Sequence, residues 1–305
     1  MIPRIESVRC DLCGADEYNL LFKSRDVATG IPGVFPVVIC RCCDLVYLNP
    51  RPDEESLAGY YSEKYPPFLL GKGLVGLARG ILRRREARKI GEWLPPNARI
   101  LEIGCALGDL LVPLRDCGFD VTGIDISPYA SSLARERHGL RVHTGTVFDA
   151  PVEEGSLDVI IMRGVLEHLP SPKKALQKAA SLLTNEGHLF IGTPNFDCLD
   201  RRVFGEFWHG LQIPRHLNIF TIKTLPKLLA TVGFEIREVQ YRVVANDWIL
   251  SSKYLLEEKL GRQSWLAFFS LRNPVLHLFF LPLTILQRGS ATSGRMEVVA
   301  VKVMP

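Results

Sequence analysis

A regular alternation of apolar strands and helices begins near residue 98 and limits the folds that this chain can adopt. Strands are predicted at residues 98–104, 119–127, 140–145, 157–164 and 187–195, and several of the helical segments between them end on glycine. Two further strands are predicted at 235–244 and 296–303. Alternation of this length favours a Rossmann-like α/β fold, an open and mostly parallel doubly wound sheet with helices on both faces.

The turn after the first strand, in the stretch ARILEIGCALGDLL (98–111), predicts a ligand site. Gly104 and Gly108 bracket this turn, and glycine lets the backbone approach a ligand closely. Asp125 ends the next strand, where a carboxylate suits the two hydroxyls of a ribose. Ala106 stands where such a loop usually carries glycine. We expect a negative φ at Ala106, which would accommodate its methyl group.

The spacing of GCALGD differs from the G-x-G-x-x-G fingerprint of dinucleotide sites, which disfavours a nicotinamide-dependent oxidoreductase. It resembles instead motif I of class I S-adenosylmethionine-dependent methyltransferases, and the resemblance continues through three further motifs over residues 96–245. It implies a seven-stranded sheet with an antiparallel last strand, and S-adenosylmethionine as cofactor. Asp125 would hold the ribose, and Thr146 and Val147 would border the adenine. The cofactor-binding residues that the resemblance implies are Glu102, Gly104, Ala106, Gly108, Asp125, Ile126, Thr146, Val147 and Arg163.

Two C-x-x-C pairs near the N-terminus predict a metal site. Cys10 and Cys13 form the first pair, and Cys40 and Cys43 form the second. Four thiolates suit tetrahedral zinc, and we expect this zinc to be structural because a short segment without a large core gains stability from a metal. Cys42 could compete as a ligand, although the spacing favours Cys40 with Cys43. The module resembles N-terminal zinc modules that are fused to some sugar and small-molecule methyltransferases.

Candidate catalytic groups follow the fourth and fifth predicted strands. Methyl transfer needs a base only to remove the proton of the acceptor, because the sulfonium leaves readily. His168, next to Glu167, is the first choice as base, and His216 is the second. A structural role for His168, anchoring the following helix, is the alternative. A metal at Glu167 and His168 is not expected, because Gly164 stands where quinone-type relatives carry an acidic residue.

The same two loops bear on the substrate. Arg215 could hold an anionic substrate group, or could pair with a carboxylate on the surface. Methylation of the amino groups of nucleic-acid bases commonly uses an N-P-P-Y-like turn after the fourth strand, and MRGVLEHLP lacks one. A net charge of +4 does not imply nucleic acid either. We therefore expect a small-molecule or sugar-type substrate and no nucleic-acid partner.

About fifty residues, rich in apolar side chains, separate the last two predicted strands. They are expected to form a helical lid, which suits a hydrophobic or lipid-linked substrate or contact with a membrane surface; packing of these helices on the sheet is the alternative. The basic segment RGILRRREARK (79–89) could bind anionic lipid or RNA, or could only face solvent. No signal-peptide core and no membrane-spanning run is present. We expect a cytoplasmic protein, with peripheral contact at the inner membrane face as an option and the oligomeric state open.

The predicted organisation is a zinc-ribbon-like module at 1–55, a linker with the basic helix at 56–95, the S-adenosylmethionine-binding core at 96–245, the lid at 246–295 and the last core strand at 296–305. The predicted function is O-methylation of a sugar, a glycan precursor or another small metabolite. Three alternatives stay open: RNA methylation guided by the zinc module, C-methylation of a nucleotide sugar, and a non-catalytic scaffold.

Overall fold

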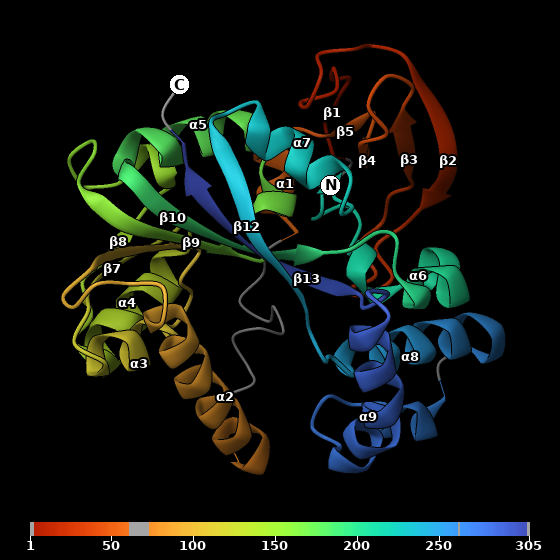
Figure 1. Ribbon diagram of the computed structural model, residues 1–305. Helices are drawn as coiled ribbons and strands as arrows, with labels where there is room; N and C mark the ends of the chain where they lie inside the picture. Colours follow the sequence, from red (N-terminus) through yellow and green to blue (C-terminus); the bar gives the residue numbers. More distant parts are fainter. Residues whose placement is uncertain (1–2, 61–72, 262, 304–305) are drawn as a thin grey trace.

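A seven-stranded sheet with the order β12-β13-β10-β9-β6-β7-β8 lies at the centre of the computed structural model, which describes residues 3–60, 73–261 and 263–303 (Figure 1). β13 is antiparallel to both neighbours, while the pairs from β10 to β8 are parallel. The predicted fold class, with its antiparallel last strand, is confirmed. The strands are β6 (Arg99–Ile103), β7 (Asp120–Asp125), β8 (Val142–Thr144), β9 (Leu157–Arg163), β10 (Leu183–Pro194), β12 (Phe234–Tyr241) and β13 (Arg295–Lys302).

Both faces of this sheet are buried, because successive side chains of a strand point to opposite sides. Ile100 of β6 and Ile161 of β9 pack in the core with α2, α3 and α4, whereas Leu101 and Ile160 pack on the opposite face with α5 and α7. Figure 1 shows helices on both sides of the sheet. These helices are α2 (Gly73–Gly91), α3 (Leu111–Asp116), α4 (Pro128–His138), α5 (Pro172–Leu182) and α7 (Thr224–Ala230).

Local signals set the ends of several helices. The Ser127 side chain accepts a hydrogen bond from the Ala130 N–H at 3.2 Å at the start of α4, and Gly139 ends this helix with φ +60°. Helix α5 ends at Leu182. Leu183 already pairs with Leu157 of β9, so β10 begins directly after the helix.

The N-terminal cysteine segment forms a four-stranded sheet of order β11-β4-β3-β2 and a small β1–β5 pair. β11 comes from residues 218–219, far along the chain, so this sheet is completed by the segment that follows β10. Residues 61–72 of the predicted linker lie outside the described residues. The elements are β1 (Ile5–Glu6), β2 (Tyr18–Ser24), β3 (Phe35–Cys40), β4 (Val46–Leu48), β5 (Arg51–Pro52), α1 (Glu54–Ala58) and β11 (Asn218–Ile219).

The predicted helical insertion between the last two strands is present as α8 (Asn246–Leu260) and α9 (Pro274–Gly289), joined through a short 3-10 segment at Ser264–Phe268. α6 (Leu199–Phe204), which follows β10, packs against α8. In Figure 1 the α8–α9 insertion and α2 extend below the sheet as two separate projections. Within the described residues, no helix combines the length and the apolarity needed to cross a membrane.

Candidate functional site

The glycine turn and Asp125 face each other across the carboxyl ends of β6 and β7. The backbone N–H of Ala106 donates to Oδ2 of Asp125 at 2.8 Å, and the Ser127 N–H donates to Oδ1 at 2.9 Å. Burial raises the pKa of Asp125, and these two backbone hydrogen bonds oppose that effect. The two places in the sequence that were predicted to hold one ligand therefore lie together.

Ala106 adopts φ +47°, so the expected negative φ is wrong. Gly104 and Gly108 are also left-handed, at +71° and +77°, so the turn reverses within a few residues. A left-handed L-residue costs about 1–2 kcal/mol, and the hydrogen bond to Asp125 helps to hold Ala106 there. Strained backbone of this kind is concentrated at ligand-binding loops.

The two glycines of the turn serve packing as well as conformation. A Cβ on Gly104 would lie 2.4 Å from Cγ2 of Val165, and a Cβ on Gly108 would lie 2.3 Å from Cδ1 of Leu140. Both distances are far below van der Waals contact, so larger residues would push these neighbours away. Gly104 therefore lets the loop after β9, which carries Glu167 and His168, lie directly against the turn.

Glu102 is the acidic residue of this site that burial affects most clearly. Burial raises the pKa of its carboxyl group to about 7, and the nearby Arg163 guanidinium opposes the shift. Its Oε2 atom is buried and has no hydrogen-bond partner in the described structure. Arg163 itself forms an ion pair with Glu86 of α2. A buried carboxylate oxygen without a donor fits a cationic group, such as the ammonium or sulfonium of S-adenosylmethionine.

The remaining predicted cofactor residues surround the ends of β7 and β8. Ile126 is exposed, whereas Val147 is buried among core residues. The Thr146 side chain accepts a hydrogen bond from the Phe148 N–H, and Asp149 accepts from the backbone N–H and the hydroxyl of Thr146, which fixes the short turn. The structure thus places these residues at the carboxyl edge of the sheet, and their contact with adenine stays a prediction.

Glu167, His168 and His216 form a compact group of side chains, although they come from two loops. One ligand atom from each lies within 4.8 Å of the others, and the two imidazole rings are 4.5 Å apart, edge to face. Oε2 of Glu167 accepts a hydrogen bond from the Thr193 hydroxyl at 3.1 Å, while Oε1 is buried without a partner. The group could share a proton or hold a divalent cation. In the second case His216 would add a metal ligand to Glu167 and His168, a combination that was not predicted from the sequence.

Backbone carbonyls select the tautomer of both histidines. Nδ1 of His168 lies 3.0 Å from the Arg215 carbonyl oxygen, and Nδ1 of His216 lies 2.8 Å from that of Gly210. Because a carbonyl only accepts, each Nδ1 is the protonated donor and each Nε2 keeps its lone pair. Burial lowers the pKa of His168 to about 4 and that of His216 well below its usual value, so both rings are neutral at pH 7. His168 is partly exposed and His216 is buried.

Arg215 does not pair on the surface, as one sequence interpretation held, but in the interior. Its two terminal nitrogens donate to the two carboxylate oxygens of Asp26, each at 2.9 Å, and both side chains are at most 1% exposed. Asp26 also accepts from the backbone N–H groups of Ala28 and Thr29. This link between the cysteine segment and the histidine loop was missed, because 189 positions separate its two members and no local pattern marks Asp26.

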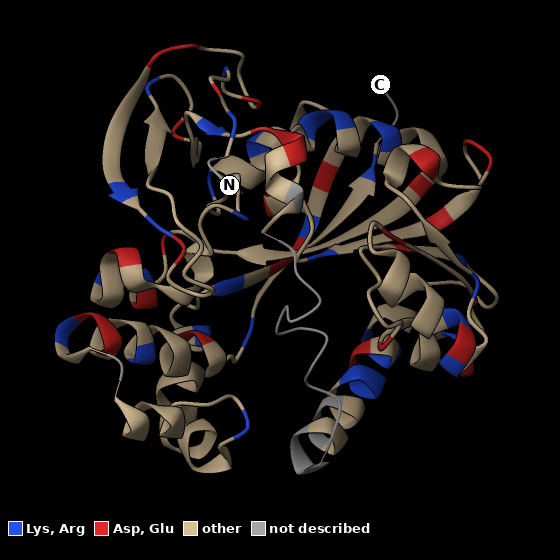
Figure 2. Cartoon of the chain, turned by 180° about the vertical axis from the view of Figure 1, so that it is seen from behind, with Lys and Arg blue, Asp and Glu red and all other residues tan. Residues whose placement is uncertain are grey.

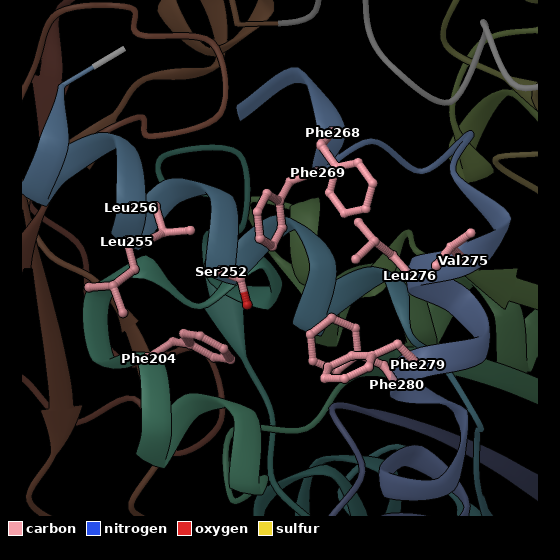
Figure 3. A pocket seen from close by; sticks show the side chains of 10 residues that line it. All are labelled: Phe204, Ser252, Leu255, Leu256, Phe268, Phe269, Val275, Leu276, Phe279 and Phe280. Carbon is pink, nitrogen blue, oxygen red and sulfur yellow. The ribbon is translucent and has the colours of Figure 1, made fainter. Parts of the chain in front are cut away.

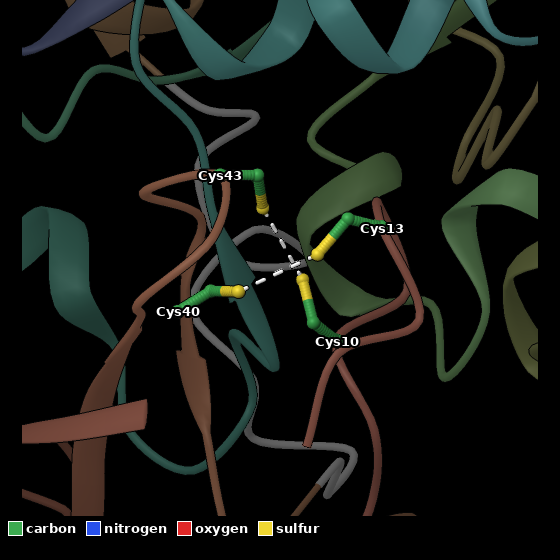
Figure 4. A group of neighbouring side chains, drawn as sticks. All are labelled: Cys10, Cys13, Cys40 and Cys43. Atoms are coloured by element: carbon green, nitrogen blue, oxygen red, sulfur yellow. Dashed lines mark hydrogen bonds between the residues drawn. The ribbon is translucent and has the colours of Figure 1, made fainter. Parts of the chain in front are cut away.

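The four predicted metal ligands lie together (Figure 4). The Sγ atoms of Cys10 and Cys43 are 3.4 Å apart, and those of Cys13 and Cys40 are 3.5 Å apart. Tetrahedral zinc with Zn–S bonds of about 2.3 Å would place sulfur atoms about 3.8 Å apart, so the cluster fits this ion. Cys42 is exposed and stands outside the cluster.

The two cysteine turns share one backbone geometry. The N–H groups of Gly14 and Asp44 each donate to the carbonyl of the first cysteine of their pair, at 2.7 and 3.1 Å. Both residues are left-handed, at φ +76° and +67°. Matched turns of this kind present two thiolates each to a common centre, as a four-cysteine site requires.

An apolar cavity of about 550 Å³ lies within the helical insertion (Figure 3). α8, α9, the 3-10 segment between them and α6 supply its walls. Its lining residues include Phe204, Leu255, Phe268, Phe269, Leu276 and Phe280. The site residues described above do not line it, so the cavity is a feature of the insertion itself.

Comparison with known proteins supports the same fold. Residues 77–239 match a family described as "Methyltransferase domain". The chain is 35% identical over 117 residues to a ubiquinone biosynthesis O-methyltransferase of Bordetella avium, covering 34% of this chain and 48% of that protein. A protein of the same name from Xanthomonas axonopodis pv. citri is 36% identical over 107 residues, covering 33% and 45%.

The chain spans about half the length of the curated relatives it matches. Among solved structures, a SAM dependent methyltransferase from Archaeoglobus fulgidus is similar with a TM-score of 0.50 at 19% identity, covering 78% of this chain and all of that one. This likeness concerns the fold. The cysteine segment and the whole helical insertion lie outside the family match.

Proposed function

The chain belongs to the methyltransferase-domain family, and we propose that it transfers a methyl group from S-adenosylmethionine to a hydroxyl oxygen of a small metabolite. The names of the relatives, which are O-methyltransferases, favour oxygen as the acceptor atom. Sugars and glycan precursors remain within the proposed substrate class. When bound, the cofactor supplies the activated methyl group, and the residues of this chain position and deprotonate the acceptor.

The proposed cofactor site uses the turn from Gly104 to Gly108 together with Asp125 and Glu102. Asp125 is held in place by the Ala106 and Ser127 N–H groups and would accept hydrogen bonds from the ribose hydroxyls. The unpartnered Oε2 of Glu102 supports a cationic ligand beside the same turn. Binding of a cation there would favour the ionised form of Glu102 and lower the pKa of its carboxyl group.

The observation that carries the catalytic proposal is the fixed tautomer of His168. Its Nδ1–H donates to the Arg215 carbonyl, so Nε2 is the ring nitrogen that would accept the proton of an acceptor hydroxyl. A base with a pKa of about 4 is weak, but Glu167, whose carboxyl pKa burial raises to about 7, is close enough to share the proton that His168 takes up. The packing of Val165 on Gly104 brings this loop to the cofactor turn. His216, which is buried behind His168, is proposed to hold that ring in place.

We also propose that Cys10, Cys13, Cys40 and Cys43 bind one structural zinc ion. The sulfur spacing and the matched turns support this assignment. All four positions around the metal would be filled by protein, which leaves none for a substrate. The metal would hold the sheet whose strand β2 ends two residues before Asp26, and through it the Asp26–Arg215 pair beside the candidate base.

Methyl transfer is tested by incubating the purified protein with S-adenosylmethionine labelled in the methyl group and with fractionated small metabolites. Mass spectrometry then identifies the products that carry the label. The expected product is a methyl ether. Label in RNA, in a new carbon–carbon bond, or in no product at all would contradict the proposal.

The base is tested with His168→Gln, which keeps a hydrogen-bond donor for the Arg215 carbonyl but cannot take up a proton. We expect kcat to fall by about 10²–10⁴-fold, the usual range for a general base. His138→Gln, on the exposed end of α4, is the matched control and should retain full activity. Equal activity of the two variants would exclude His168 as the base, while unchanged cofactor affinity in both confirms that the site is intact.

A further inference from the structure

The helical insertion carries an apolar face with nothing packed on it in the described structure. On α9 the exposed apolar side chains recur with the spacing of one helix face, and Leu278 and Phe279 are 69% and 72% exposed. The opposite side of the same helix is buried, with Leu276 and Thr284 among its residues. The other exposed apolar residues of this projection are Leu260, Trp265, Phe268, Val275, Leu281, Ile285 and Leu286. A contiguous face of this size marks an interaction surface.

The second projection, α2, has the same character at its free end. Leu77, Ile81 and Leu82 are exposed there, and the exposed arginines Arg84 and Arg85 follow directly. Figure 1 shows that α2 and the α8–α9 insertion extend from the same side of the sheet. Leu77 and Arg84 are seven positions apart, which corresponds to about 10 Å along a helix. This is about the depth to which interfacial helices bury apolar side chains below lipid headgroups.

The charges near these apolar faces indicate which kind of partner binds them. The sequence contains no acidic residue between Glu258 and Glu297, while Arg272 and Arg288 flank α9 on exposed positions. The one acidic residue of α2, Glu86, is neutralised by Arg83, Arg163 and Arg242. Figure 2 shows the basic residues of α2 gathered near the middle of that helix. A second copy of the chain docked face to face would bring like charges together, whereas anionic lipid headgroups would complement them.

The cavity of the insertion opens within the same apolar surface, because Val275, Phe268 and Phe279 belong to both. A cavity of about 550 Å³ lined by phenylalanine and leucine is costly to leave in contact with water. Fluid hydrocarbon chains can fill such a space without a complementary shape. We propose that α9, the 3-10 segment before it and the free end of α2 dock this protein on the surface of an anionic lipid bilayer, with acyl chains reaching the cavity.

The docking is tested by floating the full-length protein with vesicles of phosphatidylglycerol and phosphatidylcholine in equal amounts, and with vesicles of phosphatidylcholine alone. We expect binding to the anionic vesicles that weakens with salt. Leu278→Glu should weaken it by at least about tenfold, because a large apolar side chain is lost from the interface. Arg85→Gln should weaken it about fivefold, as expected for one basic residue near an anionic surface. If Leu278→Glu folds poorly, Leu286→Glu provides a second test of the same apolar face.

Val34→Glu and Arg137→Gln are the matched controls, since both residues are exposed and lie on other surfaces. They should bind like the unchanged protein. Absence of flotation, or flotation that Leu278→Glu and Leu286→Glu leave unchanged, would overturn the proposal. A concentration-dependent dimer that Leu278→Glu dissociates, without vesicle binding, would assign the face to a second copy instead. None of these measurements depends on methyl transfer, so the docking proposal and the proposed activity can fail independently of each other.

Discussion

The buried Asp26–Arg215 pair gives the sharpest test of how the cysteine segment is joined to the catalytic core. Asp26→Asn removes the negative charge but keeps the size of the side chain. The Arg215 guanidinium would then be buried without its counter-ion, because the two side chains are 0% and 1% exposed. Breaking one member of a buried, hydrogen-bonded ion pair costs about 3–5 kcal/mol. That is a large part of the stability of an ordinary domain.

The measurement is equilibrium unfolding in urea, followed by circular dichroism at neutral pH with zinc present. Asp116→Asn is the matched control, because the Arg115–Asp116 pair is about half exposed and should contribute less than about 1 kcal/mol. The double variant Asp26→Leu with Arg215→Met should recover most of the loss, since no charge remains buried.

Two results would refute this reasoning. A loss of less than about 1 kcal/mol for Asp26→Asn, with an unchanged urea dependence, would mean that the pair is hydrated or contributes little. A double variant no more stable than the single one would mean that the hydrogen bonds from Ala28 and Thr29, which asparagine can keep and leucine cannot accept, contribute as much as the buried charge.

Four further outcomes are expected. Asp125→Ala should weaken the binding of S-adenosylmethionine by at least about tenfold in calorimetry, because two hydrogen bonds to a charged group are lost; equal affinity would exclude the ribose assignment. Ala106→Gly should raise the free energy of unfolding by about 1 kcal/mol by relieving the left-handed strain, and a lower stability would contradict the observed φ. For Glu102, the folded pKa of about 7 exceeds the unfolded value of about 4.5, so its contribution to stability is complete at low pH and is lost as pH rises through 7. Glu102→Gln should therefore gain up to about 3 kcal/mol relative to the unchanged protein between pH 5 and pH 8 without cofactor. Cys43→Ser should abolish binding of one equivalent of zinc per chain, measured by metal analysis of the purified protein; zinc retained in full would exclude Cys43 as a ligand.

Much of the fold could be predicted from the sequence because its signals are local. The apolar runs at 98–104 and 157–164 became β6 and β9, since buried parallel strands need continuous apolar residues. The convergence of the two C-x-x-C pairs could be predicted, because each turn presents two thiolates independently of its surroundings. Asp125 could be placed beside the glycine turn because adjacent parallel strands end at the same edge of the sheet.

The contacts between segments far apart in the chain are seen only in the folded protein. The sequence predicted the order of the strands and helices, the glycine turn and the cysteine cluster, because each depends on neighbouring residues. It did not determine the left-handed Ala106, the packing of Val165 on Gly104 or the pairing of Asp26 with Arg215. These depend on which surfaces meet when the core closes, and the free energy that selects them comes from burial and charge pairing across the whole molecule.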